Sequence, residues 1–392
     1  MKILFLSRWF PEPADNGSKL RILNLLRGLA RHHEVTLLSF SDQPEVSREA
    51  KQVQSLCAES HSIPWREFNP HSARATLGFL SLSPRWLIDT FSQEMAAEIA
   101  QQLNGKKYDL VIASQLPMAA YYPYFRDVPA IFEEMELGLY MDDLQRSAHW
   151  IQRLRRRFAW FKLRMYLSRL LKHIRAVTVV SDAERELAVG NFPRLKKISV
   201  IPNGMDVDAY AEIAWTPKPH TMIFTGSFRY SVNYEAMVWF VGKVFPLILN
   251  KIPDAELIIT GDHLDLPLPA QKNIQLTGRV DDVRQWVANS AVALAPLWSG
   301  GGTRLKVLEA MALGVPVVAT SKGAEGLGAQ HGTHLFVVDS PEEFAARVIE
   351  LMQDQALASR IAFNAREFVK ANFDWSIVMP NFLQVAEDAV CE

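Results

Sequence analysis

The chain has 392 residues, of which 49% are hydrophobic and 22% charged, and its formal net charge is −1. The length suits two domains, the composition is that of a soluble globular protein, and the charge excludes a globally basic nucleic-acid binder. Two cysteines are too few for a disulfide framework, and no His, Cys or Asp cluster has the spacing of metal ligands, so we expect no metal. The first apolar run is too short for a signal peptide or a membrane span, which favours a cytoplasmic protein.

Short apolar runs alternate with helical patterns in the first half of the chain. Helices are predicted over Lys19–Ala30 and Gln93–Leu103. This alternation is typical of a parallel sheet covered by helices. The predicted strands are Ile3–Leu6, Val35–Phe40, Leu110–Ser114, Ala130–Phe132 and Val177–Ser181.

A second series of apolar runs follows a segment at 201–220 that contains prolines and a tryptophan. The whole pattern predicts two doubly wound α/β domains, over 1–205 and 206–372, and a C-terminal helix at 373–392 that crosses back to the first domain. Neither half contains the glycine fingerprint of dinucleotide-binding or P-loop proteins. The predicted strands of the second series are Met222–Thr225, Leu257–Thr260, Ile274–Thr277, Val292–Pro296, Val315–Thr320 and Leu335–Val338.

The segment at 299–320, SGGGTRLKVLEAMALGVPVVAT, joins a triple glycine, a helix and a buried strand. Glycines let the backbone approach a ligand closely, and Thr303 is predicted to cap the helix. Two cations, Arg304 and Lys306, fall in the predicted first turn, where a phosphate or diphosphate would be held by the helix dipole and by N–H donors. The residues of this predicted anion site are Gly300, Gly301, Gly302, Thr303, Arg304 and Lys306.

A basic and aromatic segment spans 146–175, and the chain has no acidic residue between 144 and 181. Helical spacing gives it two apolar stripes on opposite faces, so that one can pack on the core while the other stays available. We expect contact with an anionic membrane surface. The alternative is a helix that packs within its domain on both faces, with its arginines exposed to solvent and without a function. RNA binding is a less favoured hypothesis, and no nucleic-acid partner is expected. The stripes are Ile151, Leu154, Phe158, Phe161 and Met165, and Trp160, Leu163, Leu167, Leu170 and Ile174.

Five motifs along the chain carry a resemblance to a known family. They are Asn16-Gly17, RAVTVVS at 175–181, IPNG at 201–204, GRV at 278–280 and the glycine-loop segment at 300–320. With these motifs the chain resembles glycosyltransferase family 4, retaining enzymes of the GT-B fold, in which two Rossmann-like domains face a central cleft. The GGGTRLK variant is similar to a branch associated with exopolysaccharide assembly.

The resemblance implies a nucleoside-diphosphate sugar as donor, with UDP favoured over GDP, and no separate cofactor. By position, Glu309 is the residue that accepts hydrogen bonds from the ribose hydroxyls. The implied route is front-face attack, in which a departing phosphate oxygen takes the acceptor proton, so no catalytic base is named. Arg304 and Lys306 would stabilise the diphosphate. The other expected donor-binding residues are Gly17, Gly226, Arg229, Gly300, Gly301, Gly302 and Thr303.

The chain departs from the family pattern at several positions. Gly301 stands where the first glutamate of a family pair is expected, and Ser227 and Val232 replace an Arg and a Lys that neutralise the diphosphate. Arg304 and Lys306 are the candidates to replace that pair, with Arg229 a weaker one. Where members often carry a histidine, this chain has three glutamates without an assigned role: Glu133, Glu134 and Glu136.

The sequence therefore predicts a hexosyltransferase, peripheral at the inner face of the cytoplasmic membrane, that acts on a polyprenyl-linked or surface glycan. Two alternatives stay open. One is a non-catalytic scaffold that binds nucleotide, favoured by the departures at Ser227, Val232 and Gly301. The other is a nucleotide-sugar epimerase, which paired catalytic acids would favour.

Overall fold

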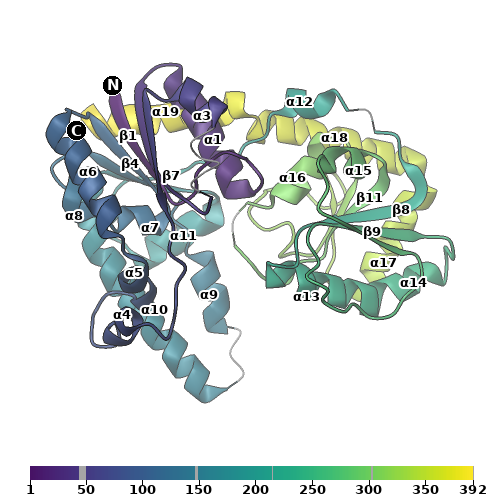
Figure 1. Cartoon of the computed structure of the whole chain (residues 1–392). Coiled ribbons are helices and arrows are strands. Elements are labelled where there is room, and N and C mark those ends of the chain that lie inside the picture. Colours follow the sequence, from purple (N-terminus) through teal and green to yellow (C-terminus); the bar gives the residue numbers. More distant parts are fainter. Residues whose placement is uncertain (44–49, 146–148, 214, 302, 392) are drawn as a thin grey trace. The chain divides into compact units, whose positions relative to one another are not determined.

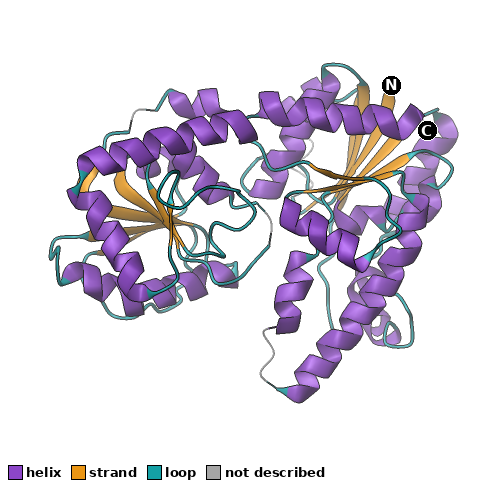
Figure 2. Cartoon of the chain, turned by 180° about the vertical axis from the view of Figure 1, so that it is seen from behind, coloured by secondary structure: helices purple, strands orange, loops and turns teal. Residues whose placement is uncertain are grey.

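The structure, a computed structural model, describes residues 1–43, 50–145, 149–213, 215–301 and 303–391. The chain forms two compact units, one of residues 1–202 with 379–392 (unit 1) and one of residues 203–378 (unit 2). Figure 1 labels their elements, and Figure 2 shows that the strands of each unit lie between helices. Both units are therefore layered α/β structures.

The sheet of unit 1 is fully parallel, with strand order β3-β2-β1-β4-β5-β6-β7. The order reverses between β1 and β4, which makes a topological switch point there. The five predicted strands are confirmed, and the sheet gains β3 and β7 at its two edges. The strands are β1 (Lys2–Ser7), β2 (Glu34–Ser41), β3 (Glu59–Pro64), β4 (Leu110–Ser114), β5 (Ala130–Glu133), β6 (Ala176–Val179) and β7 (Ile198–Val200).

Helices α1, α4, α6 and α11 of unit 1 begin where the sequence supplies a side-chain cap. The Asn16 side chain accepts a hydrogen bond from the Lys19 N–H, so Gly17 is the first residue of helix α1 rather than part of a loop. The helices are α1 (Gly17–Ala30), α3 (Lys51–Leu56), α4 (Ala73–Leu77), α5 (Arg85–Thr90), α6 (Gln93–Gly105), α7 (Gln115–Ala119), α8 (Tyr122–Phe125), α9 (Gly138–Gln145), α10 (Trp150–Leu170), the 3-10 turn η1 (Leu171–His173) and α11 (Asp182–Asn191).

The last helix, α19 (Trp375–Cys391), belongs to unit 1 from residue 379 onward. Phe382, Ala386 and Ala389 on this helix are buried. Helix α1 carries Gly28, where a Cβ would stand only 2.1 Å from the Met379 sulfur, so α19 packs where α1 has no side chain.

The sheet of unit 2 repeats the same strand pattern, with order β10-β9-β8-β11-β12-β13 and all pairs parallel. Its switch point lies between β8 and β11, and all six predicted strands are present. The strands are β8 (Lys218–Thr225), β9 (Glu256–Thr260), β10 (Ile274–Gly278), β11 (Ser290–Ala295), β12 (Val317–Ala319) and β13 (Phe336–Val337).

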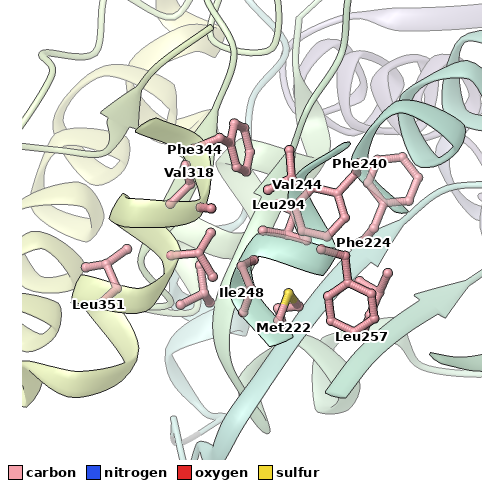
Figure 3. Packing of buried hydrophobic residues seen from close by; sticks show 14 of the residues in the cluster. Met222, Phe224, Phe240, Val244, Ile248, Leu257, Leu294, Val318, Phe344 and Leu351 are labelled. Atoms are coloured by element: carbon pink, nitrogen blue, oxygen red, sulfur yellow. The ribbon is translucent and has the colours of Figure 1, made fainter. Parts of the chain in front are cut away.

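A dense apolar core joins the strands of unit 2 to their helices. Figure 3 shows Phe224, Leu257 and Leu294 of the sheet with Phe240 and Phe344 of the helices, all within one buried cluster. Within the described residues, one helical stretch, Ser231–Leu249, has the length and hydropathy of a membrane span, but half of it is buried in this core. The helical elements are α12 (Val207–Ala211), α13 (Ser231–Trp239), the π-helical turn η2 (Phe240–Val244), α14 (Phe245–Leu249), α15 (Val283–Ala288), α16 (Leu305–Ala312), α17 (Pro341–Gln353) and α18 (Gln355–Phe373).

Candidate functional site

The switch point of unit 2 gathers the glycine-rich loops of that unit. Gly226 directly follows β8, and the loop with Gly300 and Gly301 follows β11 and leads into α16. Gly302 lies outside the described residues. Ligands of open α/β sheets bind at this edge, beside the carboxyl ends of the strands.

The predicted start of α16 was wrong by one residue. The helix begins at Leu305 with Arg304 at the N-cap, so Lys306 is its second residue and not its third. Thr303 does not cap the helix. Its hydroxyl oxygen accepts a hydrogen bond from the Asn203 N–H, at 3.4 Å.

Arg304 is buried, with 5% of its surface exposed, and its guanidinium faces backbone carbonyls. It donates to the carbonyl oxygens of Gly300 at 2.7 Å, Gly301 at 3.0 Å and Lys322 at 3.0 Å. Arg304 therefore fixes the course of the glycine loop. Its predicted contact with a phosphate stays a prediction.

Lys306 has its ammonium group at the centre of the candidate site. The Nζ donates to Asn233 Oδ1 at 2.8 Å and lies 4.0 Å from the centre of the Phe224 ring. Burial, followed by the positive charge of Arg304, lowers the pKa of Lys306 to about 7. An anion bound beside this lysine would restore its charge and gain a direct ion pair.

Gly226 supplies the open space beside this ammonium group. Its φ is +151°, and a Cβ there would lie 2.7 Å from Asn233 Nδ2 and 3.0 Å from Lys306 Nζ. Asn233 also donates from Nδ2 to the Ser227 carbonyl at 2.8 Å. One asparagine thus ties the loop after β8 to the lysine of α16.

Replacing Gly226 with alanine should displace Lys306 and also strain the backbone. We expect donor binding to weaken by about tenfold to a hundredfold, since a misplacement of about 1 Å can cost that much, and unfolding free energy to fall by about 1–3 kcal/mol, because alanine rarely adopts a positive φ. Calorimetric titration with UDP measures the first and urea unfolding the second. The control is Gly328→Ala, because Gly328 also has positive φ (+67°) but no atom within 4 Å of its would-be Cβ. Equal binding by the two variants would contradict the assigned role of Gly226.

Glu309 lies on α16 three residues beyond Lys306 and is partly buried. The Tyr210 hydroxyl donates to Glu309 Oε1 at 3.1 Å, and burial raises the pKa of the carboxyl group. The spacing puts Glu309 and Lys306 on the same side of the helix. A cation and a hydrogen-bond acceptor therefore stand one turn apart.

Two further features of the glycine loop bear on binding. Gly300 has a φ of +99°, which favours glycine, and a Cβ there would stand 2.8 Å from the Tyr230 hydroxyl oxygen, so a larger residue would be strained and would move that side chain. Ser299 is buried, and its hydroxyl oxygen has no hydrogen-bond partner within the described part of the chain. A buried hydroxyl without a partner is costly unless a ligand pairs with it.

Two further residues were predicted to bind the donor, Arg229 and Gly17. Arg229 is exposed and pairs with Asp262, Nε to Oδ2, at 2.7 Å. Gly17 belongs to unit 1, at the start of α1. Sequence reasoning missed Asn233 and Tyr210, which belong to no motif and are identified only by their contacts. It also gave no role to Ser299, which begins the glycine-loop segment and is identified by its buried hydroxyl without a partner.

The three glutamates after β5 have different surroundings. Glu133 is fully buried and pairs with Arg21 of α1, Oε1 to Nε, at 2.7 Å, while Ser114 donates to its other oxygen at 2.6 Å. Glu134 accepts from Gln115 Nε2 at 2.8 Å, and burial followed by the charge of Glu133 raises its pKa to about 8. Gln115, Glu134 and Glu136 line a cavity of about 210 Å³ within unit 1.

Helix α10 separates its two predicted stripes as expected. Leu163, Leu167 and Leu170 are buried against unit 1, whereas Ile151, Leu154 and Phe158 of the other stripe are exposed. Arg146 lies outside the described residues. The prediction that one apolar face stays available is thus confirmed, and contact with a membrane stays a prediction. Across the described residues, no three His, Cys, Asp or Glu side chains gather so as to hold a metal ion.

Two family profiles match consecutive parts of the chain. The profile described as Glycosyltransferase Family 4 matches residues 16–209. The profile described as Glycosyl transferases group 1 matches residues 219–354. The matches follow the two sheets, with the second covering Gly226, Lys306 and Glu309.

Named relatives align over parts of the sequence. The putative glycosyltransferase YtcC of Bacillus subtilis (strain 168) is 25% identical over 240 residues, 53% of this chain and 58% of that protein. The phosphatidyl-myo-inositol mannosyltransferase of Mycobacterium tuberculosis (strain ATCC 25618 / H37Rv) is 29% identical over 204 residues, 48% of this chain and 53% of that protein. The chain spans about half the length of the curated relatives it matches.

A solved structure matches over nearly the whole chain. The crystal structure of Anabaena Alr3699/HepE in complex with UDP and glucose superposes with a TM-score of 0.69 at 17% identity, covering 99% of this chain and 100% of that one. At this identity the likeness shows the fold, which is GT-B, with its two Rossmann-like domains.

Proposed function

Because this chain belongs to glycosyltransferase family 4, we propose that it is a retaining hexosyltransferase using a nucleoside-diphosphate sugar, with UDP preferred over GDP. The acceptor we propose is a lipid-linked or cell-surface glycan, as in the exopolysaccharide branch that GGGTRLK resembles. One observation carries the donor assignment: Lys306 and Glu309 share one side of α16 at the switch point of unit 2. The UDP in the Anabaena neighbour's complex supports this choice of nucleotide.

In the proposed reaction, the bond between the anomeric carbon and the β-phosphate oxygen breaks. The acceptor hydroxyl forms a new bond to that carbon on the same face, and its proton passes to the departing phosphate oxygen. Negative charge therefore develops on the nucleoside diphosphate. Lys306 and the backbone N–H groups of the glycine loop would stabilise this charge, with Arg304 holding the loop in place.

The other contacts follow from the same geometry. Glu309, held by Tyr210, would accept hydrogen bonds from the ribose hydroxyls. Ser299 would give its buried hydroxyl to the diphosphate or to the sugar. No separate cofactor is required by this scheme.

The proposed acceptor also suggests a place in the cell. We propose a cytoplasmic protein, peripheral at the inner face of the cytoplasmic membrane and held through 146–175. The exposed stripe of α10 supports this, and so does the mycobacterial relative, whose name specifies a phosphatidyl-inositol substrate.

Donor turnover tests the proposal directly. The protein is incubated with UDP-glucose, UDP-galactose, UDP-N-acetylglucosamine and GDP-mannose, and the released sugar is followed by proton NMR. We expect one UDP-sugar to be cleaved, with the first-formed sugar in the donor's own anomeric configuration. The opposite anomer would contradict retention. Binding without cleavage, even with lipid-linked acceptors present, would favour the scaffold, and an altered sugar still joined to UDP would favour the epimerase.

A further inference from the structure

A short loop of unit 1 exposes an unusual number of large apolar side chains. The loop joins α4 to α5, and Leu80 at its tip has 90% of its surface exposed. Its exposed apolar members are Phe79, Leu80 and Leu82, and Leu77 at the end of α4 adjoins them. Isolated exposed leucines are ordinary on protein surfaces, but a contiguous group of this kind marks an interaction site.

The backbone of this loop is fixed although its side chains point outward. The buried Lys162 of α10 donates from Nζ to the carbonyl oxygens of Gly78 at 3.1 Å and Phe79 at 3.0 Å. Arg85 donates to the Ala75 carbonyl at 2.8 Å and lies 3.7 Å from the centre of the Phe79 ring. The loop is therefore anchored to α10, and its backbone would not need to become ordered before its apolar side chains contact a partner.

An apolar cavity lies between the loop and α10. It measures about 530 Å³, and aromatic rings of both elements line it, among them Phe79, Trp86, Phe158 and Trp160. The exposed stripe of α10 continues the apolar surface beyond the cavity through Leu154 and Phe161.

The charge around this surface indicates what covers it. Arg155 and Arg156 line the cavity, and Arg153, Arg157 and Arg164 are exposed along α10. Helix α10 itself contains no acidic residue, and Arg156 pairs with Asp143 of α9 at 3.3 Å, so the surface carries an excess of positive charge with this one ion pair at the cavity. Apolar side chains flanked by cations match the interface of an anionic bilayer, where arginines lie at the headgroups and apolar groups reach the acyl chains.

We propose that the α4–α5 loop and the exposed stripe of α10 insert together into an anionic bilayer, and that the cavity between them holds the hydrocarbon chain of a membrane lipid. This rests on the proposed peripheral association and adds a second inserting element and a lipid-chain site. The inference concerns unit 1 alone, so it is independent of the donor chemistry.

Co-sedimentation with vesicles of phosphatidylcholine and phosphatidylglycerol tests the insertion of the loop. Leu80→Ser should weaken vesicle binding by about tenfold, which is the loss of one fully buried leucine. The matched control is Phe363→Ser, which removes a similarly exposed ring from α18 of unit 2 and should bind as wild type. UDP-sugar hydrolysis should be unchanged in both variants.

Quenching by vesicles with brominated acyl chains tests the cavity. In a Trp150→Phe background, which replaces an exposed indole of α10, the tryptophan emission should be quenched on vesicle binding through Trp86 and Trp160, which line the cavity. Ala159→Phe fills the cavity from α10 and should reduce the quenching while vesicle binding persists. Quenching that Ala159→Phe leaves unchanged would overturn the lipid-chain site.

The outcomes distinguish this inference from the proposed peripheral membrane association on which it rests. Anionic-vesicle binding that Leu80→Ser does not weaken would overturn the insertion of the loop and leave the association through α10 standing. Failure of the wild type to bind anionic vesicles would overturn both. Equal binding to vesicles of phosphatidylcholine alone would contradict the role of the arginines.

Discussion

Substituting Lys306 with methionine should lower the rate of sugar transfer by about a hundredfold to a thousandfold, the usual effect of removing one donor that stabilises transition-state charge. Methionine keeps an unbranched apolar side chain of similar length and removes the ammonium group, whose Nζ lies 4.0 Å from the centre of the Phe224 ring. Donor binding should weaken less than turnover, because the charge on the diphosphate grows as the sugar departs.

The lowered pKa of Lys306 adds a pH dependence to this prediction. At pH 8 the free site holds a largely neutral lysine, because its pKa is about 7. Binding a diphosphate raises that pKa, so binding takes up a proton, and affinity falls as pH rises above 7. Calorimetry with UDP-glucose in two buffers of different ionisation enthalpy measures this uptake, since the diphosphate of the sugar donor does not titrate near neutrality.

A matched lysine provides the control. Lys243 is exposed on η2 of the same unit, and Lys243→Met should leave transfer, binding and proton uptake unchanged. Proton uptake that persists in Lys306→Met would assign the titration to another group and remove the main support for this lysine as the phosphate contact.

The largest loss of stability should come from Arg21→Met in unit 1. Arg21 is 1% exposed, and it donates to Glu133 and to the carbonyl oxygens of Ile201 and Pro202, both at 3.0 Å. The substitution would leave a fully buried carboxylate without its cation, which costs about 3–5 kcal/mol. The midpoint of urea unfolding should fall accordingly.

Two further variants separate the ion pair from simple packing. Arg31→Met, on an exposed residue just after α1, should change the unfolding free energy by less than about 0.5 kcal/mol. The double variant Arg21→Met with Glu133→Met should recover much of the loss, because no charge is left buried. A double variant as unstable as Arg21→Met alone would show that the carbonyl contacts, and not the carboxylate, dominate.

The fold was largely predictable because buried parallel strands are apolar throughout. Strand β4, for example, is buried along its whole length and was predicted with its bounds. Strands β3 and β7 escaped prediction because neither carries a long apolar run: β3 is polar with one buried residue, and β7 has only three residues. The sequence pattern of a buried parallel strand is a near-continuous apolar run, which both segments lack.

Only those residues of the candidate site that lie close together in the sequence could be predicted. The triple glycine, Lys306 and Glu309 belong to one motif, and their positions on one helix follow from its spacing. Asn233 and Tyr210 come from distant elements, so their contacts depend on the packing of the whole unit. The direction of the Arg304 guanidinium, toward the loop's carbonyl oxygens, likewise depends on the folded conformation of the loop and could not be predicted from the sequence.

A crystal structure of the protein with UDP would test the central claim most directly. We predict the diphosphate within hydrogen-bond distance of Lys306 Nζ and of the backbone N–H groups after β8 and β11, with the ribose hydroxyls on Glu309. Lys306 would then turn from Asn233 toward the phosphate while Arg304 stays on the loop carbonyls. UDP bound elsewhere, or bound here without contact to Lys306 and Glu309, would contradict the account.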